Sequence, residues 1–352
     1  MEIVLPDKSY EIIVKRHGLD SVGEWIASLW QNKKIAIISD ENVFPIYSEK
    51  IRQQLSEYEV CYYTVPAGES SKSLEMANNL YDFLADNQFT RSDAIIALGG
   101  GVVGDLASFV ASTYMRGIAF VQIPTSLLAQ VDSSIGGKTA VNSSKAKNMI
   151  GTFAQPDGVL IDPETLNSLP ELRVREGIAE IIKCGAISDA SLWKDLEKLT
   201  GIQDLLEHSE AIIQKALQVK KTVVEEDEFD NGSRLLLNFG HTIGHAIENT
   251  AGYGVISHGE AVAIGMVKIS QIAEEKGLSP VGMTEKIKMM NQKYHLPNKY
   301  QPWEAEKYFT AITHDKKARG DSLNIILLKE IGQAYIQKIN MTEIKDFLVE
   351  GK

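Results

Sequence analysis

Two histidines, His241 and His245, lie four residues apart in the helix-compatible stretch LNFGHTIGHAIE. Residues at this spacing share one face of a helix, so both imidazoles could reach one metal ion. Zinc proteases with the same histidine spacing carry a glutamate after the first histidine, where this chain has Thr242. The motif therefore indicates a metal site without the general base of peptide hydrolysis. Histidines without any metal are an equally open interpretation of this motif alone.

A third histidine, His258, begins another expected helix in SHGEAVAIGM, after a glycine-rich loop. A helix hairpin would bring it beside the helix of His241. Catalytic zinc commonly has three protein ligands and an open position, often with two histidines and one carboxylate. The carboxylate could come from Glu180 in REGIAEIIKCG, and Glu176 and Glu260 are rival donors. The residues predict a site with two histidines and one carboxylate.

A glycine-rich turn lies in the first half of the chain, where LGGGVVGD contains G-x-G-x-x-G as Gly99, Gly101 and Gly104. After a strand and before a helix, such glycines let the backbone approach a pyrophosphate at the helix N-terminus. The usual fingerprint places a ribose-binding acid about 20 residues further on, but no acid occurs from Ala107 to Val131. Asp40 ends an earlier expected strand, which indicates a related nucleotide fold with a different strand order.

The segment 123–151 is dense in small polar residues, glycines and lysines. Lys138 follows two glycines, and Lys147 and Asn148 lie at what looks like a helix start, a setting that suits anion binding. A single lysine of this kind is usually a solvated surface residue. The acid-poor, glycine-rich surroundings of Lys138 favour the anion site.

These residues must be positioned by two kinds of structure. Strand and helix patterns alternate in the first half, which predicts βαβ units and a mainly parallel sheet. The expected strands are 34–40, 59–65, 93–99, 118–124 and 158–162, with helices at 45–55, at 73–87 and through 107–112. From Glu176 to about Gly277 the periodicity is helical, followed by one strand-like run at 323–336. Prolines among polar residues at 165–172 predict a boundary, with a nucleotide-binding α/β domain at 1–168 and a mainly helical metal- and substrate-binding domain at 169–352.

The composition restricts the class of protein. The chain has 352 residues, 44% hydrophobic and 24% charged, as expected for a globular protein of about two domains. Its net charge of −11 argues against generic binding to nucleic acid or to an anionic membrane, while local basic clusters could still bind an anionic small substrate. Cys61 and Cys184 are too few for a disulfide framework or a cysteine metal site. Neither a signal peptide nor a membrane span is predicted, so a cytoplasmic location is expected.

The motifs taken together resemble the 3-dehydroquinate synthase family, in order and over essentially the whole chain. They are PAGESSK, GGGVVGD, YMRGIAFVQIPTSLLAQVDSSIGGKTAVN, KNMIG, GIAEIIK, VKKTVVEEDE, LNFGHTIGHAIE and HGEAVAIGM. The resemblance implies a Rossmann-like N-terminal domain, a mostly α-helical metal-binding domain, and commonly a homodimer. It also implies the second step of the shikimate route, which leads to chorismate and the aromatic amino acids. In that step 3-deoxy-D-arabino-heptulosonate 7-phosphate becomes 3-dehydroquinate and phosphate, through transient oxidation by NAD, phosphate elimination, re-reduction and aldol cyclisation.

The resemblance also implies roles for individual residues. A divalent metal, zinc or cobalt, would be held by Glu180, His241 and His258, leaving His245 to relay protons or contact substrate. The matches for NAD are Asp40, Asn42, Glu69, Lys72, Gly100, Gly101, Val102, Gly104, Asp105, Thr125, Ser126, Lys138, Lys147, Thr165 and Ser168. The matches for substrate are Arg116, Asp132, Lys138, Asn148, Lys183, Lys220, Arg234, Asn238, His245 and Lys316, with Lys316 preferred to Lys317. The chain departs from the family pattern at Ser126, at Leu172 and Arg173, and at Asp230, a candidate for proton transfer.

Three other functions compete with this prediction. Another sugar phosphate cyclase, such as 2-deoxy-scyllo-inosose synthase acting on glucose 6-phosphate, would share the metal ligands and the glycine turn. Lys138 and the lysine of VKKTVVEEDE match the dehydroquinate synthase pattern instead. A polyol dehydrogenase of the glycerol dehydrogenase type would release reduced NAD and need no phosphate pocket. A nucleotide-binding regulatory module would have no use for three metal ligands.

Overall fold

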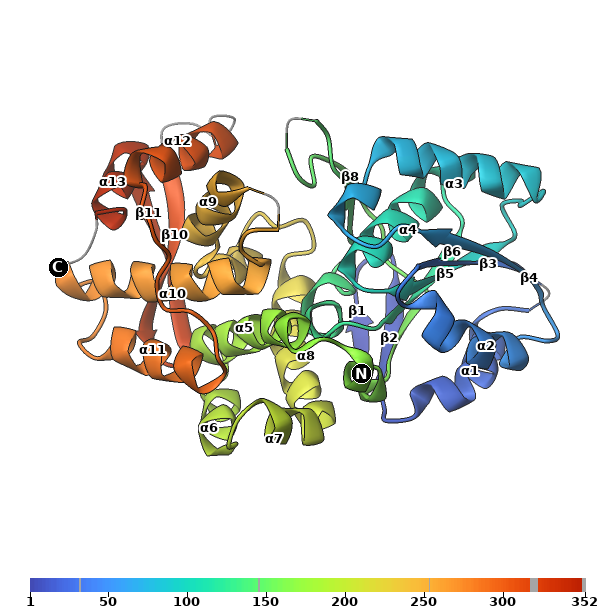
Figure 1. The fold of residues 1–352 in the computed structure, drawn as a ribbon, viewed down its shortest axis with the longest axis horizontal. Coiled ribbons are helices and arrows are strands. Elements are labelled where there is room, and N and C mark those ends of the chain that lie inside the picture. Colours follow the sequence, from blue (N-terminus) through green and yellow to red (C-terminus); the bar gives the residue numbers. More distant parts are fainter. Residues whose placement is uncertain (32, 145, 253, 317–321, 350–352) are drawn as a thin grey trace. The chain divides into compact units, whose positions relative to one another are not determined.

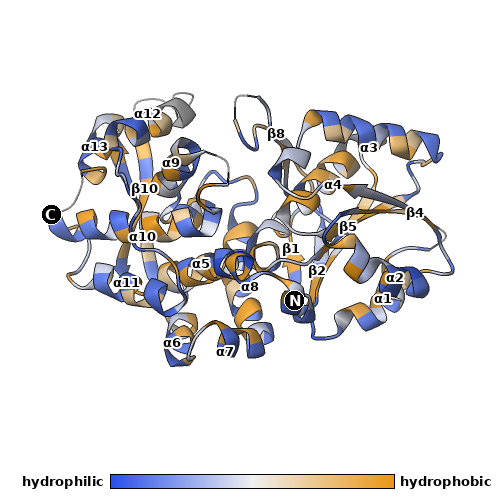
Figure 2. Ribbon diagram, viewed as in Figure 1, coloured by the Kyte–Doolittle hydropathy of each residue, from blue (hydrophilic) through white to orange (hydrophobic). Residues whose placement is uncertain are grey.

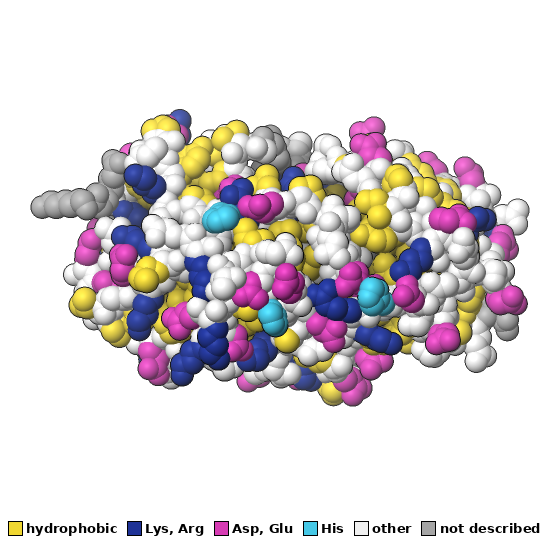
Figure 3. Space-filling model, turned by 60° about the horizontal axis from the view of Figure 1, so that its bottom comes forward, with side chains coloured by type: hydrophobic (Ala, Val, Ile, Leu, Met, Phe, Trp, Pro, Cys, Tyr) yellow, Lys and Arg dark blue, Asp and Glu magenta, His cyan; other side chains and the backbone are white. Residues whose placement is uncertain are grey.

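The structure is a computed structural model that describes the whole chain except residues 32, 145, 253, 317–321 and 350–352, and except the side chains of 314–316. The chain forms two compact units, Met1–Pro170 and Glu171–Lys352 (Figure 1). Among the described helices, none combines the length and the apolar character needed to cross a membrane. Acidic and basic side chains are interspersed over the face drawn in Figure 3.

The first unit is built on a seven-stranded sheet with the order β1-β2-β9-β6-β5-β3-β4. Only β1 and β2 pair antiparallel, and the other neighbours are parallel. The strands are β1 (Glu2–Val4), β2 (Ser9–Val14), β3 (Lys34–Asp40), β4 (Glu59–Val65), β5 (Ala94–Gly99), β6 (Ala119–Pro124) and β9 (Gly158–Ile161). The predicted α/β fold with a mainly parallel sheet is confirmed.

Helices enclose both faces of this sheet, which explains its continuous apolar strands. Along β3, Ile35 and Ile37 belong to one hydrophobic cluster, and Ala36 and Ile38 belong to the other. The first cluster includes residues of α1 (Val22–Leu29) and α2 (Phe44–Gln54), and the second includes residues of α3 (Leu74–Asp86) and α4 (Gly101–Thr113). Figure 2 shows hydrophobic and hydrophilic residues side by side along α3, as expected for a helix with one buried face.

Several elements of the first unit were not predicted. Strands β1 and β2 are short and half exposed, so they lack the long apolar run that marks the central strands. The acid-poor segment forms a π-helical turn, η4 (Ala129–Ser133), and a two-stranded hairpin of β7 (Lys138–Val141) and β8 (Ile150–Phe153). These strands were not predicted, because the glycines and small polar residues of this segment give no apolar run typical of a strand.

The second unit is mostly helical and arranged around α10 (His258–Glu275), which packs against α5, α9, α11, α13 and β10. The other helices are α5 (Glu171–Ile187), α6 (Ala190–Lys198), α7 (Ile202–Glu207), α8 (Ser209–Glu226), α9 (His241–Ala251), α11 (Met283–Lys293), α12 (Ala305–Lys316) and α13 (Ile344–Phe347). The strand-like run at 323–336 belongs to an antiparallel hairpin of two strands, β10 (Ser322–Glu330) and β11 (Gln333–Asn340). The predicted helical character of this half of the chain is confirmed.

Candidate metal and nucleotide sites

The nucleotide candidates of the first unit follow the carboxyl ends of parallel strands. The chain places β4 on one side of β3 and then crosses to β5 on the other side, so the strand order reverses between β3 and β5. Ligands of open α/β sheets bind at such a reversal. Asp40 ends β3, and Gly100 directly follows β5. Asp40 therefore ends the strand next to that of the glycine turn, and its contact with a ribose stays a prediction.

The glycine turn leads straight into α4, with Gly100 as the residue before the helix. The first peptide N–H groups of a helix have no partner within it and attract anions such as phosphate. A Cβ atom on Gly101 would lie 2.9 Å from Oγ of Ser133, so a side chain would crowd this helix start. The turn suits the close approach of a pyrophosphate group to the backbone.

A network of side chains lies beside this turn. Lys72 Nζ contacts the carboxylate of Asp105 and lies 2.5 Å from Oδ1 of Asn148. Asn142 donates to Oε1 of Glu69 at 2.7 Å and accepts from the backbone N–H of Asn148 at 2.9 Å. Burial raises the pKa of Asp105, against the opposing charge of Lys72. The structure brings these four predicted residues together through Asn142, which the sequence reasoning did not select.

The other candidates of this unit lie on neighbouring segments. Asp40 Oδ1 accepts from the N–H of Asn42 at 2.9 Å, and the N–H of Thr125 donates to the carbonyl of Gly99 at 2.9 Å. Arg116, in the turn η3 (Tyr114–Arg116), has a left-handed φ of +69°, a strained conformation that recurs at functional sites. The remaining predicted positions lie in α4, after β6, in η4, at the start of β7, in the loop after β7, and in η5 (Pro163–Ser168): Val102, Gly104, Ser126, Asp132, Lys138, Lys147, Thr165 and Ser168.

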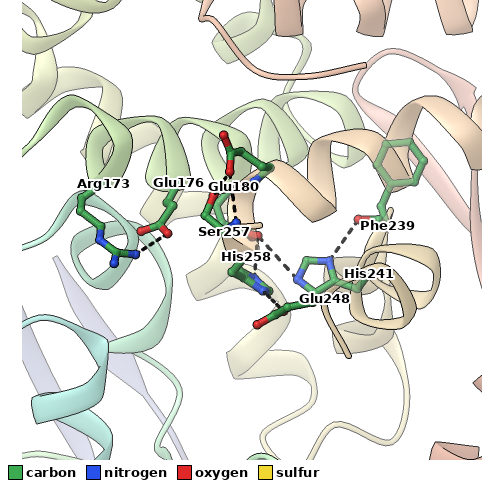
Figure 4. Close-up of polar contacts among 9 residues, drawn as sticks. Arg173, Glu176, Glu180, Phe239, His241, Glu248, Ser257 and His258 are labelled. Carbon is green, nitrogen blue, oxygen red and sulfur yellow. Dashed lines mark hydrogen bonds and ion pairs between the residues drawn. The ribbon is translucent and has the colours of Figure 1, made fainter. Parts of the chain in front are cut away.

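The second unit brings the predicted metal ligands together from three helices (Figure 4). Oε1 of Glu180 on α5 lies 3.5 Å from Nε2 of His241 and 3.5 Å from Nε2 of His258. Metal–ligand distances of about 2.0–2.1 Å in a tetrahedral zinc site would place two ligand atoms about 3.3–3.4 Å apart. The two distances from Oε1 of Glu180 are therefore close to the spacing that one divalent ion needs.

His245 lies within the same cluster. Nitrogens of His241, His245 and His258 all lie within 4.8 Å of one another, which also makes the three imidazoles a possible metal-binding group. The rival carboxylates have other partners, since Glu176 accepts from Arg173 at 2.6 Å and Glu260 forms a capping box at the start of α10. Of the three carboxylates considered in the sequence, Glu180 is thus the one that the structure directs at the histidines.

Close helix packing makes this convergence possible. A Cβ atom on Gly265 of α10 would lie 2.0 Å from the carbonyl oxygen of Gly240, just before α9. Only a glycine lets the two backbones approach so closely. Because α10 also packs against α5, the start of α10 places His258 beside both other ligands.

The electrostatics of the cluster favour a bound cation. Glu180 is 1% exposed, its Oε1 faces the two histidine nitrogens, and Lys183 forms an ion pair with its Oε2. Burial raises the pKa of Glu180, but the charge of Lys183 and those of the histidines hold it well below its usual range. Burial and the nearby charge of Lys183 lower the pKa of His241. An ionised carboxylate beside a neutral imidazole is a donor set that suits zinc or cobalt.

Each of the two predicted histidine ligands has a second contact through its other ring nitrogen. Nδ1 of His241 lies 3.2 Å from the carbonyl oxygen of Phe239, and Nδ1 of His258 lies 3.3 Å from Oε2 of Glu248 (Figure 4). Burial lowers the pKa of His258, but its hydrogen bonds to Glu180 and Glu248 and their negative charges raise it to about 10. Glu248 was missed in the sequence, although its position three residues after His245 places it on the same face of α9.

The second unit also buries three of the predicted substrate cations. Lys183, Lys220 and Arg234 are 2%, 5% and 2% exposed. They come from α5, α8 and the turn η6 (Ser233–Asn238), which pack against one another, and η6 also carries Asn238. Lys183 pairs with Glu180, and Arg234 donates to the carbonyl of Glu228 at 2.7 Å, so contact of these cations with a substrate stays a prediction. The side chain of Lys316, and all of Lys317, lie outside the described residues.

Comparisons with known proteins agree with this geometry. The family model of the 3-dehydroquinate synthase N-terminal region matches residues 62–176, and that of the C-terminal region matches residues 177–318. The 3-dehydroquinate synthase of Enterococcus faecalis is 58% identical over 350 residues, which cover 99% of this chain and 98% of that protein.

Two solved structures resemble the whole chain. A 2-deoxy-scyllo-inosose synthase, complexed with carbaglucose-6-phosphate, NAD+ and Co2+, has a TM-score of 0.90 at 28% identity and covers 100% of this chain and 99% of its own. The 2-epi-5-epi-valiolone synthase of Streptomyces hygroscopicus, with NAD+ and Zn2+ bound, has a TM-score of 0.87 at 28% identity over 98% of this chain and 97% of its own. Since the family models and the full-length sequence relative agree, the chain belongs to the 3-dehydroquinate synthase family.

Proposed function

We propose that this chain converts 3-deoxy-D-arabino-heptulosonate 7-phosphate into 3-dehydroquinate and phosphate, the activity of the family to which it belongs. The observation that carries the proposal is the convergence of Glu180, His241 and His258, which has the spacing of a divalent metal site. The full-length 58% identity to a 3-dehydroquinate synthase favours this substrate over that of the inosose synthase, which is 28% identical.

We assign NAD to Met1–Pro170 and one divalent ion, zinc or cobalt, to Glu171–Lys352. Bound NAD supplies a reversible hydride acceptor, and the ion supplies a Lewis acid for the substrate hydroxyl and carbonyl. The cyclases of similar structure, whose complexes contain NAD+ with Co2+ or Zn2+, support both groups. In this chain the start of α4 would hold the pyrophosphate, and Asp40 on the adjacent strand would hold the ribose.

The chain's own side chains bind and orient the substrate. By resemblance to the family, Lys183, Lys220 and Arg234 bind the phosphate and carboxylate, since ammonium and guanidinium groups form charge-assisted hydrogen bonds with both anions. Asn238 comes from the same turn as Arg234 and orients the substrate by hydrogen bonds. Arg116, Asp132, Lys138, Asn148 and Lys316 complete the proposed set, on family resemblance.

His245 moves the proton of the substrate hydroxyl in this proposal. Its exposed imidazole lies on the face of α9 that carries His241, with ring centroids 5.2 Å apart. An imidazole whose ordinary pKa lies near neutrality can accept a proton and return it within one turnover. The family resemblance further supports a homodimer and a cytoplasmic location, and sedimentation of the purified protein tests the first of these.

Phosphate release tests the function directly. Purified protein with catalytic NAD should release phosphate from 3-deoxy-D-arabino-heptulosonate 7-phosphate. Chelator treatment should abolish the release, and zinc or cobalt should restore it. Phosphate release from glucose 6-phosphate alone would instead indicate a 2-deoxy-scyllo-inosose synthase. Stoichiometric reduction of NAD by a simple polyol, without phosphate release, would make it a dehydrogenase.

A further inference from the structure

We propose that Glu248 is a positioning residue of the metal site, a role that rests on the proposed function. The contact between its carboxylate and Nδ1 of His258 would hold the ring so that Nε2 is left to bind the metal ion. The contact joins α9 to α10, with Oε2 of Glu248 3.3 Å from Nδ1 on one side of the ring and Oε1 of Glu180 3.5 Å from Nε2 on the other. The imidazole is thereby held between two carboxylates (Figure 4).

Three residues of α9 form one line along the helix. His241, His245 and Glu248 follow each other at spacings of four and three, which place them on the same face. The helix therefore presents a metal ligand, a proposed proton carrier and a carboxylate to the same region. Glu248 lies one turn beyond His245, where it meets the first residue of α10.

The two histidine ligands are held in different ways. Nδ1 of His241 faces the backbone carbonyl of Phe239, only two residues away in the chain. Nδ1 of His258 faces a side chain from a different helix, and Glu248 is only 15% exposed. A neutral imidazole that donates from Nδ1 must carry its lone pair on Nε2, and a carboxylate partner increases the basicity of that nitrogen. A backbone carbonyl fixes the tautomer without adding a negative charge.

Zinc affinity, measured by competition with a chromophoric chelator, tests this role without reference to turnover. Loss of a carboxylate behind a metal-binding histidine weakens metal binding about 10- to 100-fold. Glu248→Ala should show this loss, and Glu248→Gln, which can still accept from Nδ1 but has no charge, should lie between it and the wild type. Glu275→Ala, which removes an exposed glutamate from α10, should bind zinc as the wild type does.

Two further measurements separate positioning from general stability. The cobalt-loaded Glu248→Gln protein should have a shifted visible absorption spectrum, because a changed imidazole donor alters the ligand field. The metal-free variants should melt within a few degrees of the metal-free wild type. If the loss of zinc affinity is accompanied by an equal loss of stability of the metal-free protein, seen as a lower melting temperature, Glu248 has a structural role and the inference is wrong.

The inference and the metal site can fail separately. If Glu248→Gln and Glu248→Ala keep wild-type zinc affinity while His241→Ala loses it, the site stands and the role of Glu248 is refuted. If His241→Ala also keeps wild-type affinity, the metal site itself is misplaced.

Discussion

The two units form their candidate sites from different parts of the chain, mainly backbone groups in one and side chains in the other. In Met1–Pro170 the site lies at the end of a parallel sheet and depends on the backbone at the start of α4. In Glu171–Lys352 it depends on side chains from α5, α9 and α10 that meet at one carboxylate oxygen. A backbone site spreads its binding energy over many weak contacts, whereas a ligand cluster concentrates it in few atoms. Single substitutions should therefore be far more damaging in the second unit.

The largest effect is expected for His241→Ala. Dividing an apparent zinc binding energy of about 10–16 kcal/mol among the three proposed protein ligands gives about 3–5 kcal/mol for each, or a weakening of about 10²–10⁴-fold. Metal content after dialysis and phosphate release should both fall sharply, while NAD affinity stays unchanged. His208→Ala, which removes an exposed histidine of the same unit, is the matched control. Full metal occupancy in the His241→Ala variant would contradict the expectation that single substitutions are more damaging in the second unit.

Gly101→Val should have the next largest effect, on the other cofactor. A side chain at this position would meet Ser133 and keep a pyrophosphate from the helix start. Loss of one hydrogen bond to a charged group costs about 1.5–3 kcal/mol, which corresponds to about 10- to 150-fold weaker NAD binding. Equilibrium dialysis with NAD measures it. The metal content should match the wild type, and a loss of metal instead of NAD affinity would contradict the assignment of cofactors to units.

Asn142→Ala should weaken NAD binding by less, about tenfold at most, because it removes hydrogen bonds that position Glu69 and Asn148 without touching the helix start. The Michaelis constant for NAD should rise more than kcat falls. Asn78→Ala, at an exposed position of α3, controls for the loss of an asparagine. Equal kinetics for the two variants would show that the network beside the glycine turn has no part in binding.

Ser257→Ala should have the smallest effect. Ser257 and Glu260 form the capping box that starts α10, directly before His258. Removal of such a cap costs about 1 kcal/mol of unfolding free energy. Urea denaturation of the metal-free protein measures it. A loss of several kcal/mol would mean that the start of α10 depends on one hydroxyl far more than its packing against α5 and α9 suggests.

The sequence revealed the two sites to different extents, for physical reasons. Local periodicity and glycine placement were enough to predict the parallel strands β3, β4, β5, β6 and β9, and the glycine turn between β5 and α4. The hairpin of β7 and β8 escaped because its residues are small and polar, and antiparallel pairing over four residues needs no apolar run. In the second unit, residue types and spacing pointed to the three histidines. The convergence of His241 and His258 on Glu180 depends on helix packing across nearly eighty residues, which no local pattern encodes.

Asn142 and Glu248 illustrate the same limit. Both lie inside motifs that matched the family, GGKTAVN and LNFGHTIGHAIE. Neither an asparagine nor a glutamate at these positions indicates a function by its residue type alone. The contacts of Asn142 with Glu69 and of Glu248 with His258 become visible only once the chain is folded. The helical spacing of Glu248 from His241 was the one signal available in advance.

The most direct test of the central claim compares the amount of phosphate released with the amount of NAD supplied. Nucleotide-free, metal-loaded protein would receive one equivalent of NAD and an excess of 3-deoxy-D-arabino-heptulosonate 7-phosphate, while phosphate and the absorbance of reduced NAD are followed together. If NAD is regenerated in each turnover, as proposed, the phosphate released should exceed NAD many-fold, and reduced NAD should not accumulate. Reduced NAD that accumulates one for one with consumed substrate would contradict it, because NAD would then be a substrate and not a recycled cofactor.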